Sequence, residues 1–150
     1  RGILNLDPSE NDWMTLTFHD SCNVARASRI GSYPGSQFET PRKVIKAVCN
    51  NFHDMAPETI HDATFCCGGG GGLNGIGRYR QQRNIGLKVK RDQILATGAK
   101  LVIAPCHNCW DAIRDLEEVY KIGIRWSFLK PLLINMIEVP EHLKPQEEEL

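Results

Sequence analysis

Three features of this 150-residue sequence predict an α/β fold with a mostly parallel sheet. Short β-prone runs alternate with longer segments whose apolar residues recur at helical spacing. The run Leu101-Val102-Ile103-Ala104 is continuously apolar, as a strand buried on both faces would be. Cysteines follow the expected strands, at the sheet edge where open α/β folds collect ligands. We therefore expect a Rossmann-like three-layer domain with cysteine ligands on loops at the C-terminal strand ends.

The first half of the chain contains two of the expected strands and one helix. Residues 14–18 alternate and are rich in β-forming residues, which predicts the first strand. Turn-forming residues at 31–37 predict a loop, and Pro41 then suits the start of a helix whose apolar positions extend to Phe52. A second, short strand is expected at 63–66, directly before a run of glycines.

The second half continues the alternation. A helix is expected over residues 79–97, and Gly98 is a typical helix stop. The apolar strand 101–104 follows and is closed by Pro105. The remaining expected elements are a helix over 110–120 with Asn108 as its cap, a strand near 124–126 and a short helix over 129–137.

One domain accounts for most of the length. We expect a linker at 1–12, a cysteine-rich domain at 13–138 and an acidic tail at 139–150. The sequence opens with Arg1 rather than Met, which suggests a fragment of a longer subunit. No apolar run reaches membrane-spanning length and no secretion signal is present, so the sequence favours a cytoplasmic protein with reduced or metal-bound cysteines.

The formal net charge is zero, so no overall basic field points to nucleic acid as a partner. One segment is nonetheless strongly basic, because residues 78–91 carry six Lys or Arg side chains and no acid. This segment is interpreted either as a solvated helix face or as a docking surface for an acidic partner.

The cysteines form the main functional signal. Cys49 lies at helical spacing with apolar neighbours and is interpreted as a core residue. The other five are expected to converge on one pocket as metal ligands: Cys22, Cys66, Cys67, Cys106 and Cys109. Thiolates select zinc, copper(I) or iron–sulfur centres, and structural zinc is the main alternative to a cluster. A thioredoxin-like dithiol at Cys106 and Cys109 would leave Cys66 and Cys67 unexplained.

Residues beside these cysteines are candidates for supporting roles. Gly68, Gly69 and Gly70 can bring backbone N–H groups close to a cofactor. His19 and His107 can donate a proton to a leaving thiolate, or hydrogen-bond a cluster sulfur, and each also suits a purely local structural role. The glycines match the dinucleotide-binding fingerprint by letter, but the flanking strand-to-helix context is missing.

The same residues resemble a known family. Cys22, Cys66-Cys67-Gly68 and Cys106-x-x-Cys109 resemble one copy of the cysteine-rich CCG domain of heterodisulfide reductase and related oxidoreductase subunits. The strings at 17–26 and 65–72 are similar to those of DsrK-type iron–sulfur subunits, which belong to the membrane complex serving dissimilatory sulfite reductase. Such subunits usually carry ferredoxin-like motifs and a second CCG copy, and their absence here agrees with a fragment.

The resemblance implies a function and a cofactor. The five cysteines would bind a non-cubane [4Fe–4S] cluster at which a disulfide is split by single electrons. Cys66 and Cys67 would be the catalytic ligands. The positions of His19 and His107 beside the expected ligands, rather than the resemblance, make them candidate proton donors. The implied substrate is the disulfide or trisulfide of a small sulfur-carrier protein. Electrons would come from a quinone-interacting haem subunit, which would also hold this cytoplasmic subunit at the membrane. Zinc binding for subunit assembly is the alternative.

Overall fold

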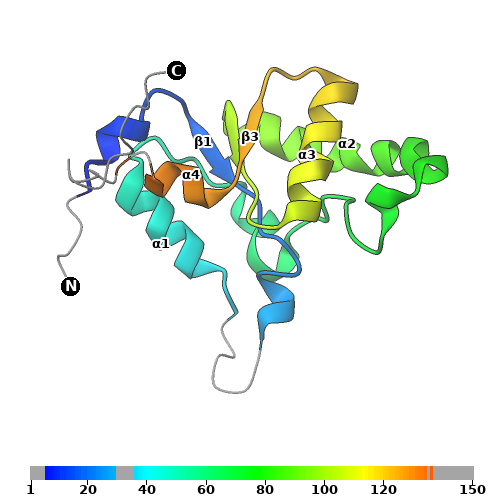
Figure 1. Ribbon diagram of the computed structural model, residues 1–150, viewed down its shortest axis with the longest axis horizontal. Helices are drawn as coiled ribbons and strands as arrows, with labels where there is room; N and C mark the ends of the chain where they lie inside the picture. The colour runs from blue at the N-terminus through cyan, green and yellow to red at the C-terminus, as the bar shows by residue number, and fades with distance from the viewer. Residues whose placement is uncertain (1–5, 30–35, 135, 137–150) are drawn as a thin grey trace, which may run out of the picture.

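Three parallel strands form the centre of the molecule (Figure 1). The structure is a computed structural model that describes residues 6–29, 36–134 and 136. The strands are β1 (Leu16–Phe18), β2 (Leu101–Ile103) and β3 (Arg125–Ser127), adjacent in that order. Leu16 pairs with Leu101, and Leu101 pairs with Arg125. The sheet is therefore parallel, as the sequence predicts.

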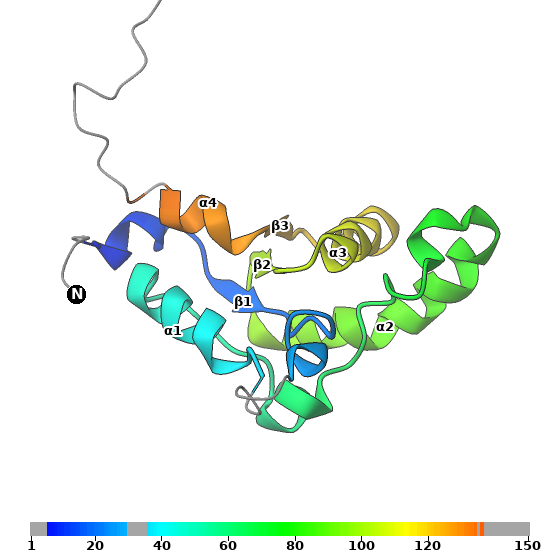
Figure 2. The ribbon, with the colours of Figure 1, turned by 60° about the horizontal axis from the view of Figure 1, so that its bottom comes forward.

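Helices cover both faces of this sheet, which confirms the three-layer expectation (Figure 2). The helices are α1 (Glu39–Val48), α2 (Arg80–Thr97), α3 (His107–Tyr120) and α4 (Leu129–Ile134). Leu16, Phe18 and Ile103 pack with α1 and α4 in one apolar cluster. Val102, at an alternate position of β2, packs with α2 and α3 in the other. Successive side chains of a strand point to opposite faces, so β2 contributes to both clusters.

The expected strand at 63–66 is wrong. The sheet position beside β1 is taken by Phe52, which forms a parallel bridge with Leu16. Around it, the Leu16 N–H donates to the Asn51 carbonyl (3.0 Å) and the His53 N–H donates to the Leu16 carbonyl (2.9 Å). Because that edge is already paired, the chain before Cys66 forms a 3-10 turn at His61–Ala63 instead of a strand.

The position of Phe52 also defines where ligands can gather. After β1, the chain first pairs with one edge of this strand at Phe52 and later with its other edge at β2. The direction in which the chain adds neighbours to the sheet therefore reverses at β1. In doubly wound sheets the crevice beyond the carboxyl ends of the strands at such a reversal is the usual ligand site. The segments that follow β1 and β2 carry Cys22 and Cys106, respectively.

Helix α2 ends where the sequence predicts, whereas α1 and α3 differ from their expected bounds. Helix α1 ends at Val48, because Cys49 is extended and Phe52, expected on this helix, bridges to Leu16 in the sheet instead. Gly98 ends α2 in the left-handed conformation, with φ of +68°. Helix α3 begins at His107, one turn earlier than expected, because the Trp110 N–H donates to the Cys106 carbonyl (2.9 Å). Cys106 therefore occupies the N-cap position, whereas Asn108 lies within the first turn and is not the cap.

The basic segment 78–91 is not uniformly solvated. Arg83 and Lys90 lie on the buried side of α2 together with Leu87 and Ile94. Only the other cations of the segment can contribute to a docking surface, which corrects that interpretation for two of its six members.

The ends of the chain are described in part. Residues Pro8–Asn11 form a 3-10 helix, and the Asn11 side chain donates to the carbonyls of Val48 (2.8 Å) and Leu132 (3.2 Å). The last residues of the expected linker therefore pack against the domain. The expected acidic tail, the end of the expected 129–137 helix and most of the expected loop at 31–37 lie outside the described residues. Among the residues described, no helix is both long and apolar enough to cross a membrane.

Candidate metal centre

Two cysteines from distant segments meet beyond the ends of β1 and β2. Cys67 Sγ and Cys109 Sγ lie 3.0 Å apart, and each residue is 2% exposed. Ser21, which follows β1, donates a hydrogen bond from Oγ to Cys109 Sγ at 3.0 Å. The glycine loop, the first turn of α3 and the segment after β1 thus contribute to one buried site, as the sequence predicts.

His19 completes this buried group. It is 1% exposed, and one of its ring nitrogens lies within 4.8 Å of both Cys67 Sγ and Cys109 Sγ. Its burial disfavours the imidazolium and lowers the pKa of His19, although a hydrogen bond with Cys67 acts in the opposite direction. Among the described residues, His19 Nδ1 has no hydrogen-bond partner. The buried imidazole of His19 therefore lies beside the two sulfurs, where burial disfavours its charged form.

The two sulfurs differ in acidity because they share one proton. The hydrogen bond between Cys67 and Cys109 has the largest effect and lowers the pKa of Cys67 to about 4, against the effect of burial. Contacts from His19 and from the Gly69 N–H, which lies 3.5 Å from Cys67 Sγ, also favour the Cys67 thiolate. The same pairing raises the pKa of Cys109. A preformed thiolate at Cys67 suits a soft metal ligand.

Two of the three predicted glycines are required by close packing. A Cβ on Gly69 would lie 2.2 Å from the Asn108 carbonyl oxygen. Gly68 has φ of +78°, and its N–H donates to Cys66 Sγ at 3.2 Å. Around Gly70 a Cβ would meet no atom within 4 Å. The first two glycines therefore bring the loop against α3 and orient sulfur, whereas Gly70 faces open space.

The remaining predicted ligands are not part of this group of ligand atoms within 4.8 Å of one another. Cys22 and Cys106 are half-buried, Cys66 is exposed, and none of them is in a disulfide. The Asn23 side chain donates to Cys106 Sγ across 4.0 Å, which links the segment after Cys22 to the start of α3. Cys49 packs in the opposite cluster with α1 and α4, in line with its expected core role.

His107 does not join the buried sulfurs. Its side chain is 76% exposed and forms an ion pair with Asp111 at 3.6 Å. Its ring is stacked near Trp110 and Phe128, with both centroid distances at 6.3 Å. Of the two predicted histidines, the structure therefore brings only His19 to Cys67 and Cys109.

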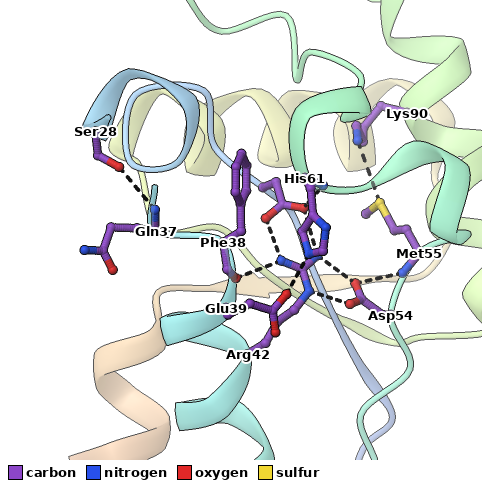
Figure 3. Close-up of polar contacts among 10 residues, drawn as sticks. Ser28, Gln37, Phe38, Glu39, Arg42, Asp54, Met55, His61 and Lys90 are labelled. Atoms are coloured by element: carbon purple, nitrogen blue, oxygen red, sulfur yellow. Dashed lines mark hydrogen bonds and ion pairs between the residues drawn. The ribbon is translucent and has the colours of Figure 1, made fainter. Parts of the chain in front are cut away.

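A buried ion-pair network supports the segment that carries His19 (Figure 3). Arg42 of α1 donates to both carboxylate oxygens of Asp20, at 2.7 and 2.8 Å, and is 2% exposed. Arg42 also pairs with Asp54 at 2.5 Å, and the His61 N–H donates to Asp20 at 2.8 Å. Burial opposes ionisation of Asp20, but these hydrogen bonds prevail and lower its pKa. Sequence reasoning missed this network because its members are far apart along the chain.

A buried lysine was also missed. Lys90 is completely buried, and its Nζ contacts Met55 Sδ at 3.7 Å (Figure 3). Burial lowers the pKa of Lys90 to about 8, while the charges of Cys67, Asp20, Cys109 and Cys66 raise it. The available sequence signal was its helical spacing from Leu87 and Ile94, which places it on the same face as these apolar residues.

The donor set fits a sulfur-ligated metal or cluster. Two buried sulfurs 3.0 Å apart, one of them favoured as a thiolate, are soft donors of the kind that zinc, copper(I) and iron–sulfur centres take. Hydrogen-bond donors to sulfur are present at Ser21, Gly68 and Gly69. Such donors tune the potential of iron–sulfur centres.

Comparison with known proteins agrees with this chemistry. Residues 16–114 match the family model of the cysteine-rich domain, CCG. The chain is 44% identical over 70 residues to "Hdr-like menaquinol oxidoreductase iron-sulfur subunit" of Archaeoglobus profundus, covering 47% of this chain and 11% of that protein. It is 47% identical over 68 residues to "Hdr-like menaquinol oxidoreductase iron-sulfur subunit 2" of Archaeoglobus fulgidus, covering 45% and 11%.

A third relative matches over a longer stretch. "EtfAB:quinone oxidoreductase" of Syntrophomonas wolfei is 28% identical over 116 residues, covering 73% of this chain and 15% of that protein. The chain thus spans only about a tenth to a seventh of the length of these relatives. No solved structure matched it. Two of these relatives are thus named as Hdr-like iron–sulfur subunits. The match to the family model spans the segments that carry all five predicted ligands, so the chain belongs to the cysteine-rich CCG domain family.

Proposed function

We propose that this chain is the catalytic iron–sulfur domain of a heterodisulfide reductase-like subunit that reduces a sulfur–sulfur bond. The observation that carries this proposal is the buried meeting of Cys67 and Cys109, and the other three cysteines lie on the segments that supply this site. Five thiols exceed the four that a tetrahedral zinc or a cubane cluster takes from protein. The surplus favours a non-cubane [4Fe–4S] cluster.

Each residue has a definite task in this proposal. The cluster would be held by Cys22, Cys66, Cys67, Cys106 and Cys109. When bound, such a cluster supplies single electrons to a sulfur–sulfur bond. Ser21 and Gly69 donate hydrogen bonds to Cys109 and Cys67, and the buried ring of His19 lies against these two sulfurs. The exposure of Cys66 and the open space at Gly70 would leave an approach for a substrate sulfur.

The proposed substrate is the disulfide or trisulfide of a small sulfur-carrier protein, as in DsrK-type subunits of dissimilatory sulfur metabolism. Reduction of a disulfide consumes two electrons and two protons and yields two thiols. Reduction of a trisulfide consumes four electrons and four protons in total, because it yields hydrogen sulfide in addition to the two thiols. The electrons would come from a quinol through a membrane haem subunit, which agrees with the menaquinol and quinone named for the relatives. The domain itself would lie on the cytoplasmic side, attached through its partners.

Zinc is the second candidate, and a specific observation favours it. His19, Cys67 and Cys109 offer three ligand atoms within 4.8 Å of one another. Histidine and cysteine are the usual ligands of structural zinc, which stabilises a fold without redox chemistry. Under this alternative the domain would hold subunits together.

A single-turnover assay tests the proposed function. The chain, reconstituted with iron and sulfide without oxygen, is reduced chemically and mixed with a disulfide-linked carrier protein. We expect two thiols for each disulfide consumed and one disulfide consumed for every two reduced domains, because each cluster would supply one of the two electrons. A zinc-loaded sample and the Cys67→Ser variant serve as controls and should release none. Equal thiol release by the zinc-loaded sample would contradict the proposal.

A further inference from the structure

Two cations occupy the buried face of α2, where apolar residues are expected. The inward positions are Arg83, Leu87, Lys90 and Ile94, spaced three or four residues apart. Arg83 is neutralised locally, because its guanidinium forms an ion pair with Asp115 and also donates to Asn74. Lys90 is in a different situation. It is completely buried, and its nearest polar contact is a thioether, Met55 Sδ, at 3.7 Å.

Lys90 forms no ion pair with a carboxylate within the described part of the chain. Asp20 acts on it at longer range, but both Asp20 oxygens are engaged by Arg42, and one of them also accepts from the His61 N–H. An ammonium group buried without a partner anion costs several kcal/mol. A charged Lys90 therefore needs a negative charge other than a paired carboxylate, and the contact shown for its Nζ is with the uncharged Met55 sulfur (Figure 3).

The sulfur site is the available source of that charge. The charges of Cys67, Cys109 and Cys66 all act on Lys90, and the Lys90 charge in turn acts on His19. Packing places Lys90 on the same side of the sheet, because Met55, which its Nζ contacts, belongs to the buried cluster of Cys67 and Cys109. A Cβ on Gly68, the neighbour of Cys67, would also lie 3.1 Å from Leu87, which shares the buried face of α2 with Lys90. If the five cysteines bind a cluster as thiolates, the site would carry negative charge that a buried cation offsets strongly, because the dielectric constant in the interior is low.

We propose that Lys90 is the fixed countercharge of the cysteine site, a positioning residue that raises the reduction potential of the centre held there. This inference rests on the proposed function, because it concerns the cluster that the five cysteines would bind. Each electron that enters the site adds negative charge. A cation held close by in a dry environment stabilises the reduced state more than the oxidised one, and so favours reduction.

The test is a redox titration of the loaded chain, followed by electron paramagnetic resonance. Lys90→Met replaces the ammonium by an unbranched apolar side chain that suits the buried face of α2. We expect the equilibrium constant for one-electron reduction to fall by about tenfold, which is a drop of about 59 mV. Lys90→Arg keeps the charge and should stay near the wild-type potential. Lys88→Met removes a matched charge from an exposed position of the same helix and should change nothing.

The outcomes separate this inference from the proposed function. If the wild-type chain contains iron and sulfide but Lys90→Met has the wild-type potential, the countercharge is refuted and the proposed function is unaffected. Equal shifts in Lys90→Met and Lys90→Arg would mean that packing rather than charge sets the potential, which also refutes it. If the wild-type chain takes up zinc and no sulfide, the proposed function fails and this inference fails with it.

Discussion

Cys67 Sγ lies 3.0 Å from Cys109 Sγ, although the two residues are 42 positions apart in the chain. Both are buried, and neither is in a disulfide. Backbone packing makes this approach possible, because Gly69 is pressed against the Asn108 carbonyl in the first turn of α3. The contact between the two sulfurs joins the glycine loop to the first turn of α3. It is the contact on which the proposed metal centre depends.

Replacing Cys67 should remove the metal centre, whereas replacing Cys49 should not. Cys67→Ser removes one of the two central sulfurs, so we expect iron and sulfide to fall to background after anaerobic reconstitution. Cys49 lies in the other apolar cluster, where its sulfur contacts the Asn11 carbonyl at 3.7 Å. Cys49→Ser should therefore retain full iron and sulfide. Loss of the cluster from Cys49→Ser alone would show that the ligand assignment is wrong.

Gly69 and Gly70 should respond differently to alanine. A Cβ at Gly69 would lie 2.2 Å from the Asn108 oxygen, so Gly69→Ala must displace the loop or α3. Overpacking of this kind costs about 1–3 kcal/mol, and we expect a matching loss in the free energy of unfolding by urea together with lower iron content. The Cβ added by Gly70→Ala would have no atom within 4 Å, so this variant is the matched control. Similar losses in the two variants would contradict the packing described here.

Arg42 should be essential for stability. Arg42→Met removes the partner of two carboxylates, and the buried Asp20 keeps only the hydrogen bond from the His61 N–H. Breaking a buried ion pair by removing one partner costs about 3–5 kcal/mol, measured as the free energy of unfolding. Arg29→Met removes an exposed partner of Asp62 and is the control, with an expected loss below about 1 kcal/mol.

Acid should destabilise the domain through Asp20. The pKa of Asp20 is lower in the folded state than in the unfolded chain, so its contribution is fully present above the unfolded pKa of about 4. That contribution is lost as the pH falls through the lower, folded pKa. Asp20→Asn should therefore show a shallower loss of unfolding free energy below about pH 4 than the wild-type chain. An unchanged slope in this variant would exclude Asp20 as the group responsible.

The sequence predicted β1, β2 and the end of α2, because each depends on the residues of that segment alone. The runs at β1 and β2 are apolar or β-prone by themselves, and Gly98 is suited to the left-handed position that ends α2. The strand expected at 63–66 failed because the sheet edge was already filled by Phe52, and this pairing depends on where the chain lies in space. A short apolar run does not reveal whether a sheet position remains free.

Sequence reasoning anticipated the meeting of Cys67 with Cys109 but not the charged surroundings of this pair. Cysteine spacing indicated the meeting of the glycine loop with the first turn of α3, because both were expected near strand ends. The charged groups behind it were not predictable by residue type, since Lys90 and Arg42 belong to a class that is rarely buried. Their burial depends on partners that are distant in sequence, such as Asp20 for Arg42.

Metal and sulfide analysis of the chain purified without oxygen tests the central claim most directly. Iron, acid-labile sulfide and zinc are measured together, and electron paramagnetic resonance spectra are recorded on the oxidised sample before and after addition of a thiol. The account predicts about four irons and four sulfides for each chain, with a spectrum that changes when thiol is added. Stoichiometric zinc without sulfide would contradict it.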